Sequence, residues 1–555
     1  MMARTSTTWF TRFTRTGNSL RVEQRGHYSA ERLIALQKYS DSASVMEILT
    51  LVLLTPLPCL LAIILADVAP LNPPEAGTNS NIVFWLRSCL IIWLYTLSFV
   101  VQFREMLPVL PMSQARGLGI TIFVSSGVIA NAYTMSLVIG FPVPFLMVLG
   151  APVWMILLLG SFAISWRHHI RGNSVLQAQI VDGLKMFVVQ MSMIVIYPFY
   201  SYIFTKLSSV EQAWFSLVLL IIKLAIKNGI SYYIRSNTDM QPEIVVFNVD
   251  VFNALFVSFS MQNSTSQLTV IVIITVDFIR MAGSIREVVH LVRELKRMED
   301  HINVLKAVLK GNVQPLQNSR NALARACSIV ARRSFASRNH TKMGPTLQID
   351  PLVYISRANR IHPTQGPTLP AIAQKSLESQ APESSHRTSN RWKSSSGANA
   401  QSNLVFMERL YARKVLNLLH LTEFTILVEY IEVVVPVVYS IYVVAMSFFP
   451  NRIYYTQLAH MDADNLQSTL SNVLLYSFLE FISLIVLCLF LWKTVEFVPT
   501  CQLAFVLRTQ WRMVQSKLVL WVVYVVQSSL VHFGADYSFQ FAWLKADPSY
   551  SQNTG

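Results

Sequence analysis

Long apolar runs constrain this sequence more than any other feature. A helix needs roughly 20 mostly apolar residues to cross a bilayer, and it satisfies its own backbone hydrogen bonds there. We expect such helices over 45–66, 82–102, 118–140, 142–166, 184–205, 211–231, 244–261, 267–283, 424–449, 469–492 and 515–534. The pattern predicts an all-α fold, a polytopic helical membrane bundle of about eleven spans. Gln515 and Lys517 open the last segment, so an amphipathic interfacial helix is the alternative there.

Composition supports the membrane assignment. The 555 residues are 53% hydrophobic and 14% charged, whereas soluble domains carry about 25% charged residues. A soluble chain with so few charges would expose large apolar patches and aggregate. The five cysteines are scattered without a CxxC pair, so we expect neither a metal site nor a structural disulfide.

The distribution of Lys and Arg predicts the orientation, because these residues concentrate on the cytoplasmic side. Residues 1–44 hold seven of them and residues 67–81 none, and segment 284–423 holds 21 against nine Asp and Glu. We therefore place the N-terminus and segment 284–423 in the cytoplasm and the C-terminal tail, 535–555, outside. The basic tail 1–44 is expected to touch anionic lipid, with a mitochondrial presequence as the alternative.

The long cytoplasmic loop divides the membrane region into about eight helices in 45–283 and about three in 401–534. Residues 284–310 carry apolar side chains at three- and four-residue steps, which predicts a helix. It could form a short coiled coil, lie on the membrane or continue the eighth span in solvent. Residues 311–400, rich in Ser, Pro and Gln, are predicted to be disordered. Their basic character suits anionic lipid, and phosphorylation would weaken that attraction; no folded basic module indicates nucleic-acid binding.

Two carboxylates interrupt the ninth span. Glu429 and Glu432 are three residues apart and share one helix face. An acidic residue at the centre of a spanning helix costs about 2.5–3.5 kcal/mol, so each needs a partner, a proton or a wet cavity. Pro436 frees the carbonyl oxygen of Glu432, and such oxygen clusters suit hard cations and protons. A structural salt bridge is the alternative, as is Glu429 at the headgroup level.

Other spans carry polar residues that could complete a site. In the tenth span, Asn472, Tyr476, Glu480 and Ser483 fall on one helix face. The candidate ion- or solute-binding residues are Glu429, Glu432, Glu480, Asp277, Asp250, Tyr476 and Asn472.

Four basic residues also fall within the spans. Lys223 and Lys227 lie one turn apart in the sixth span and are expected to snorkel to the interface. Arg280 follows Asp277 by three residues, a spacing at which the two charges can neutralise each other. Arg87 lies near the outer end of the second span and is expected to be interfacial.

The absence of several known motifs argues against some function classes. The sequence has no phosphate-binding G-x-x-x-x-G-K-[ST] loop, no G-x-S-x-G, no H-E-x-x-H and no EF-hand loop. We expect no enzyme and no cofactor, although a membrane-embedded transferase remains a third hypothesis. The first hypothesis is a transporter or channel for a cation or small solute. The rival is a non-transporting scaffold that acts through the basic loop. The substrate, the organelle and the oligomeric state are not indicated.

Two stretches resemble a known family. They are DVFNALFVSFSMQ (250–262) and VEYIEVVVPVVYSIYVVAMSFFPNRIYY (428–455), which are similar to segments of uncharacterised multi-spanning membrane proteins from oomycetes. The resemblance implies a multi-pass architecture and no activity.

The orientation predicts which glycosylation sites stay unused. Asn339-His-Thr lies in the cytoplasmic segment, so Asn339 is expected to carry no glycan. A gel-mobility shift on endoglycosidase treatment, lost in Asn339→Gln, would show that the orientation is inverted.

Overall fold

The computed structural model describes residues 22–24, 26–107, 110, 112–172, 174–234, 238–263, 267–310, 326–329, 389–456, 458–459, 463–495 and 498–535. Regular structure in these ranges is helical, apart from one isolated bridge. The helices are α2 (Ala30–Ser42), α3 (Val45–Leu54), α4 (Leu57–Asp67), α5 (Ile82–Met106), α6 (Gln114–Ile139), α7 (Leu146–Ile170), α8 (Ser174–Lys206), α9 (Ser209–Tyr233), α10 (Gln241–Val245), η4 (Val246–Asp250), α11 (Val251–Asn263), α12 (Gln267–Lys310), α15 (Ser389–Ser447), α16 (Ala463–Val495), α17 (Pro499–Thr509), α18 (Trp511–Gln527) and η7 (Val531–Phe533).

Nine helical segments of the described chain are long and apolar enough to cross a membrane. They are Val45–Asp67, Ile82–Met106, Gln114–Ile139, Leu146–Arg167, Ser174–Phe204, Val210–Tyr233, Thr238–Ser258, Gln401–Ser447 and Leu470–Val495. Each matches a predicted span, which confirms the all-α, multi-pass fold. Large apolar side chains on these helices are exposed, among them Leu65, Ile164, Phe199 and Ile221. Such an apolar exterior suits contact with lipid.

The other two predicted spans take different forms. Segment 267–283 is the first part of α12, which continues unbroken to Lys310. Segment 515–534 contains α18 and η7, and α18 has 17 residues. Its length of about 26 Å falls short of the roughly 30 Å hydrocarbon core. Nearly all side chains of α18 from Met513 onward are buried. The interfacial alternative is therefore wrong, because an interfacial helix exposes a polar face.

The loop between α12 and α15 is partly helical. α15 begins at Ser389, so the last residues of 311–400, which we predicted to be disordered, belong to a helix. No proline lies between Pro382 and Pro436, and an established helix extends at a cost of one ordered residue per hydrogen bond. Residues 326–329 are also helical, and the rest of the segment lies outside the described residues.

Contacts divide the chain into two units, one of residues 294–414 and a larger one of the residues before and after. Within the 294–414 unit, the end of α12 pairs with the beginning of α15. Glu294 lies 2.7 Å from Lys414, and Lys306 lies 2.8 Å from Glu408. The predicted amphipathic helix is thus confirmed as a continuation of the eighth helix that also pairs with a second helix.

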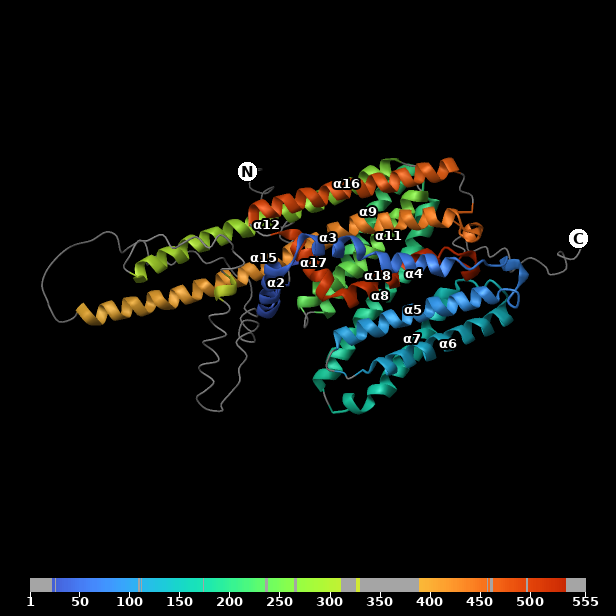
Figure 1. Ribbon diagram of the computed structural model, residues 1–555, viewed down its shortest axis with the longest axis horizontal. Helices are drawn as coiled ribbons and strands as arrows, with labels where there is room; N and C mark the ends of the chain where they lie inside the picture. The colour runs from blue at the N-terminus through green and yellow to red at the C-terminus, as the bar shows by residue number, and fades with distance from the viewer. Residues whose placement is uncertain are drawn as a thin grey trace, which may run out of the picture. The chain divides into compact units, whose positions relative to one another are not determined.

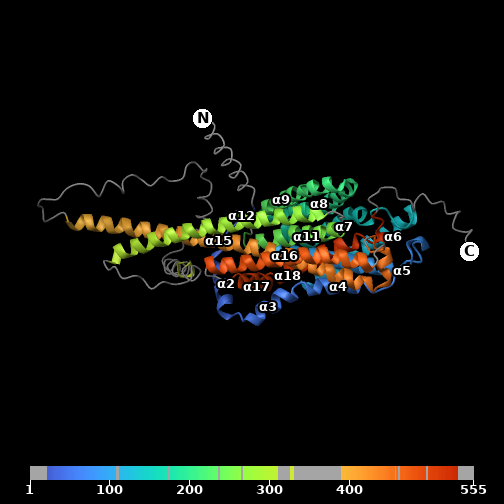
Figure 2. The same cartoon turned by 90° about the horizontal axis from the view of Figure 1, so that it is seen from above.

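Within the larger unit, the helices lie side by side with roughly parallel axes (Figures 1 and 2). In Figure 1, α5, α6 and α7 lie together on one flank, whereas α16 and the first part of α12 lie on the opposite flank. α10, η4 and α11 follow one another without a break and form the most deeply buried of the nine segments. This central helix contacts α18, so the core of the unit surrounds these two elements.

The N-terminal region is more than the tail that we predicted over 1–44. Its helix α2 packs on the larger unit with Arg32 buried. The guanidinium group of Arg32 lies 2.7 Å from Glu243 and 2.8 Å from Glu423. Leu33 is also fully buried. The composition of 1–44 predicted a basic tail. It could not indicate that Arg32 is buried, because the carboxylates that Arg32 neutralises lie more than 200 residues away.

Parts of both tails lie outside the described residues. This applies to residues 1–21, where a presequence was the alternative, to 536–555 of the C-terminal tail and to Asn339. The side of the membrane on which each loop lies therefore stays a prediction.

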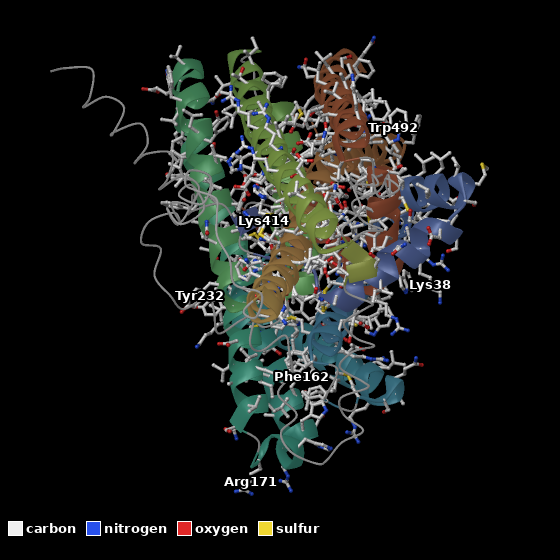
Figure 3. The ribbon with its side chains drawn as sticks, turned by 90° about the vertical axis from the view of Figure 1, so that its left-hand side faces the viewer. Lys38, Phe162, Arg171, Tyr232, Lys414 and Trp492 are labelled. Carbon is white, nitrogen blue, oxygen red and sulfur yellow. The ribbon has the colours of Figure 1, made fainter. Side chains whose placement is uncertain are left out.

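Replacement of Arg32 tests how α2 is held. We expect Arg32→Ala to lower the free energy of unfolding by about 3–5 kcal/mol, because two buried carboxylates lose their partner. Thermal unfolding of the purified protein in detergent measures the effect. Lys38→Ala is the matched control, since Lys38 lies on the same helix, is exposed and points away from the bundle in Figure 3. Equal losses for both variants would contradict the role of Arg32.

Candidate functional site

Charged side chains from five helical elements meet inside the larger unit. Lipid cannot solvate a charge, so charged groups within a membrane bundle pair with one another or line a wet cavity. We call the following eight residues the charge cluster: Lys223 and Lys227 of α9, Asp250 of η4, Asp277 and Arg280 of α12, Glu429 and Glu432 of α15, and Glu480 of α16. Six are buried, whereas the side chains of Asp277 and Arg280 are about one-seventh exposed.

The two lysines of α9 hold Asp250. Nζ of Lys223 lies 3.0 Å and Nζ of Lys227 2.8 Å from a carboxylate oxygen of Asp250. Both lysines lie one turn apart on the face of α9 that meets the central helix, and both are buried. The prediction that they snorkel is wrong, because both ammonium groups are buried against Asp250.

A π-helical turn positions Asp250. Residues Val246–Asp250 form η4, between α10 and α11. A π-helical turn adds a residue to a helix and changes the direction of the side chains on either side, and it is frequent at functional sites. In the same turn, Oδ1 of Asn248 accepts a hydrogen bond from the indole nitrogen of Trp521 at 3.1 Å. Asn248 thus fixes the turn against α18 while Asp250 faces α9.

Arg280 lies among three carboxylates. Its Nη2 contacts a carboxylate oxygen of Glu432 and lies 3.3 Å from Glu429, and its Nε lies 3.5 Å from Asp277. Lys223 lies 3.1 Å from the other oxygen of Glu432. The pair of Arg280 with Asp277 that we expected is present, but it is one part of a larger network.

α16 contributes polar side chains to the same region. The hydroxyl of Ser483 donates to Glu429 at 2.7 Å, and the hydroxyl of Tyr476 donates to Asp277 at 3.4 Å. Glu480 is buried between these two positions along the helix. Among the described residues, it forms no hydrogen bond and no ion pair within 4.0 Å, and the charge of Arg280 acts on it only from a longer distance.

Three glutamates approach one another closely enough to share a cation. Glu429, Glu432 and Glu480 each place a carboxylate oxygen within 4.8 Å of the others. Hard cations bind such oxygens at about 2.0–2.6 Å, so oxygens across one ion lie about 4–5 Å apart. Within the part of the chain that the structure describes, this is the group with a spacing suited to a metal ion. No sequence motif indicated it, because the triad arises from the packing of α15 against α16.

The charge cluster is unbalanced. Its five carboxylates outnumber its three basic side chains by two, because Arg280 is shared by three carboxylates. Carboxylates a few ångströms apart in a medium of low dielectric repel each other strongly, and a shared proton or a bound cation relieves the repulsion. The arrangement can therefore take up a proton or a small cation.

A small cavity adjoins the cluster. It has a volume of about 40 Å³ and is bordered by Lys223, Asn253 and Asp277. A water molecule needs roughly 10–15 Å³, so the cavity has room for about two or three. Oδ1 of Asn253 is buried without a hydrogen-bond partner among the described residues, which favours water at this position.

The structure brings together six of the seven residues that we singled out as candidates. Only Asn472 is placed elsewhere: it shares the helix face of Tyr476, but its side chain is exposed nearer the start of α16. Sequence reasoning did not include Lys223 and Lys227 among the candidate site residues and considered them as partners of the acids only under the scaffold hypothesis. Their signal was present, since two lysines one turn apart in an apolar span match an acidic residue in another span.

A second buried network has equal numbers of acids and bases, although Nε and Nη1 of Arg87 have no hydrogen-bond partner among the described residues. Arg87 forms an ion pair with Asp67 and is buried within the protein, whereas its depth in the membrane stays a prediction. The hydroxyls of Tyr442 and Tyr455 donate to Asp67 at 2.8 and 2.7 Å, and the amide of Gln527 donates at 3.1 Å. This network contains one acid, one base and several neutral hydrogen-bond donors. It connects α4, α5, α15 and α18, and we interpret it as a structural junction.

Comparison of the chain with protein-family models, with curated proteins and with solved structures finds no match. A function must therefore be argued from the geometry of the site.

Replacement of a glutamate with basic partners and of one without a close basic partner should affect stability differently. Glu432→Gln removes a charge that faces Lys223 and Arg280, and we expect it to lower the free energy of unfolding by about 3–5 kcal/mol. Glu480→Gln removes only repulsion and is expected to leave the melting temperature unchanged or higher. Thermal unfolding in detergent compares the two variants. An equal loss in Glu480→Gln would show that Glu480 has a basic partner.

Proposed function

We propose that this multi-pass membrane protein is a transporter or channel for a proton or small cation, with Glu429, Glu432 and Glu480 as the binding groups. One observation carries the proposal. Glu480 is buried beside two other carboxylates, and no basic side chain of the described residues forms a close ion pair with it. A structural ion-pair network has no need of an additional buried acid, because that acid only adds desolvation cost and repulsion.

The basic residues can exchange partners within the cluster. Arg280 reaches Glu429, Glu432 and Asp277, and Lys223 reaches both Asp250 and Glu432. When a cation or proton neutralises one glutamate, the base that faced it still has another carboxylate within reach. Loaded and empty sites are then both free of unpaired basic charge, which lets a buried site bind and release its ion.

The cavity beside Asp277 supports a path for the ion. Protons and hydrated cations cross a membrane protein through ionisable side chains and water. The space next to Lys223 and Asp277 suits a few waters at the edge of the cluster. Pro436 adds an oxygen, because it leaves the carbonyl of Glu432 without its helical donor.

A second candidate function is a scaffold that transports nothing and acts through its basic cytoplasmic segment. The pairing of Asp250 and Glu432 with all three basic residues of the cluster favours it, since paired charges also serve to hold helices together. The absence of enzymatic activity and the similarity to the oomycete membrane family stay predictions beside both candidates.

Reconstituted flux distinguishes the two candidates. Purified protein is reconstituted in liposomes and given a gradient of Na⁺, K⁺, Ca²⁺ or protons, and a trapped dye selective for that ion measures the flux. We expect wild-type protein to carry at least one of these ions. Glu480→Gln and Glu432→Gln are each expected to lower that flux by tenfold or more, because each removes one oxygen ligand and its charge.

The matched control is Asp182→Asn, which removes a carboxylate whose side chain is about half exposed on α8. We expect it to keep wild-type flux. Unchanged flux in both glutamate variants would remove these residues from the mechanism. Failure of the wild-type protein to carry any of the four ions would favour the scaffold.

A further inference from the structure

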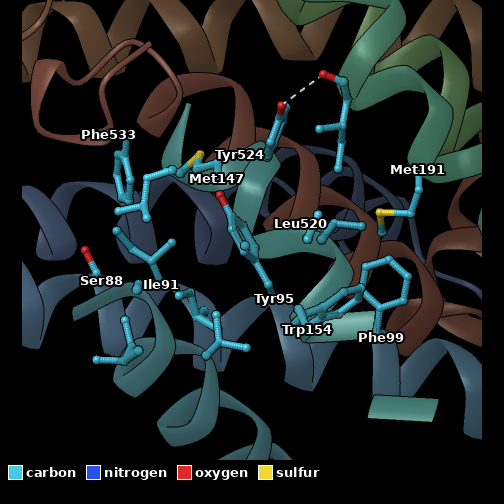
Figure 4. Close-up of a pocket in the computed structure, with 18 of the residues that line it drawn as sticks. Ser88, Ile91, Tyr95, Phe99, Met147, Trp154, Met191, Leu520, Tyr524 and Phe533 are labelled. Atoms are coloured by element: carbon cyan, nitrogen blue, oxygen red, sulfur yellow. Dashed lines mark hydrogen bonds between the residues drawn. The ribbon is translucent and has the colours of Figure 1, made fainter. Parts of the chain in front are cut away.

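A cavity of about 100 Å³ lies within the larger unit, away from the charge cluster. Helices α5, α6, α7, α8 and α18 form its walls, and Figure 4 shows the apolar and aromatic side chains that fill them. No residue of the charge cluster and no charged side chain lines it. A charged occupant is therefore disfavoured, because it would lose its hydration without gaining a counter-charge.

Most polar atoms in the wall already have protein partners. The indole nitrogens of Trp85 and Trp154 donate to the carbonyl of Thr78 at 3.2 Å and to the hydroxyl of Thr96 at 3.0 Å. The indole of Trp521 binds Asn248, as described above.

The hydroxyl of Tyr524 is also engaged. It lies 3.4 Å from the carbonyl oxygen of Ile194, the bond drawn in Figure 4. Pro198, four residues on, leaves this carbonyl without its helical donor.

Two hydroxyl groups of the wall have no partner. The oxygens of Ser88 and Tyr95 are buried and make no hydrogen bond to any described residue. Both belong to α5 and are seven residues apart, so they lie on one helix face about 10 Å from each other. A buried hydroxyl without a partner costs about 1–3 kcal/mol. An ordered water needs two to four polar partners, and most other side chains in the wall are apolar.

We propose that this cavity binds the hydroxyl-bearing end of a neutral membrane lipid. The apolar wall accepts a ring or a short stretch of hydrocarbon, and Ser88 or Tyr95 exchanges a hydrogen bond with the hydroxyl of the lipid. A space of about 100 Å³ holds only part of such a molecule, since pockets for whole drug-sized ligands are about 300–1,000 Å³. Sterols and diacylglycerols share this chemistry.

Gly150 gives a way to fill the cavity. It lines the wall on α7, and a Cβ atom at this position would meet no other atom within 4 Å. The side chain of Gly150→Leu would therefore start in open space and extend into the cavity. Gly160 lies on the same helix, is equally open and does not line the cavity. Gly160→Leu is thus a matched control for the loss of a helical glycine.

Photo-crosslinking tests the proposal. The full-length protein is reconstituted in phosphatidylcholine vesicles that contain a photoactivatable sterol, diacylglycerol or fatty acid, and labelled peptides are mapped by mass spectrometry. We expect the sterol or the diacylglycerol to label α5 or α7. Gly150→Leu is expected to reduce labelling at least tenfold, and Gly160→Leu to leave it unchanged. Tyr95→Phe removes only one oxygen atom and provides a second test in case Gly150→Leu does not fold. It should reduce labelling about fivefold.

The outcomes separate clearly. Labelling by one neutral probe and not the other identifies the source of the hydroxyl and supports the proposal. Labelling of these helices by neither neutral probe would overturn it. Equal labelling by the fatty acid, or labelling that persists in both Gly150→Leu and Tyr95→Phe, would overturn it as well.

Discussion

The pairing of buried charges across helices is the constraint on which this structure depends. In lipid the backbone is satisfied within each helix, so apolar side chains give little preference for one neighbour over another. A buried carboxylate has no such freedom, since only a few positions offer it a base. Asp250 with its two lysines and Asp67 with Arg87 join helices that are near in the sequence. Arg32 joins α2 to Glu243 and Glu423, which lie more than 200 residues away.

These networks differ in their balance of acidic and basic side chains. Around Asp67, one acid and one base are surrounded by neutral donors, so the junction has no reason to exchange ions or protons with its surroundings. The charge cluster has two more acids than bases and adjoins a cavity with room for water. The same chemistry therefore stabilises the bundle in one place and leaves a site that lacks positive charge in another.

The sequence predicted the helices and most of the candidate acids, because apolar periodicity and isolated carboxylates are local signals. It could not predict which helices meet. From the sequence, Lys223 and Lys227 were predicted to snorkel, whereas in the structure η4 places Asp250 next to both. Asn472 and Tyr476 lie on one helix face, yet only the latter reaches the cluster. Arg32 was assigned to a basic tail that touches lipid, because its buried partners lie hundreds of residues away and give no local signal. In each case, the deciding contact is non-local, and periodicity carries no information about it.

The apolar cavity and the charge cluster are chemically opposite, and one hydrogen bond connects them. Trp521 lines the cavity and donates to Asn248, which lies in the π-helical turn that ends at Asp250. A molecule seated against Trp521 changes what that indole contacts on one side while its N–H holds the turn on the other. The position of Asp250 between its two lysines depends on this turn. Trp521 therefore belongs both to the wall of the neutral cavity and to the contact that holds the turn of the charged site.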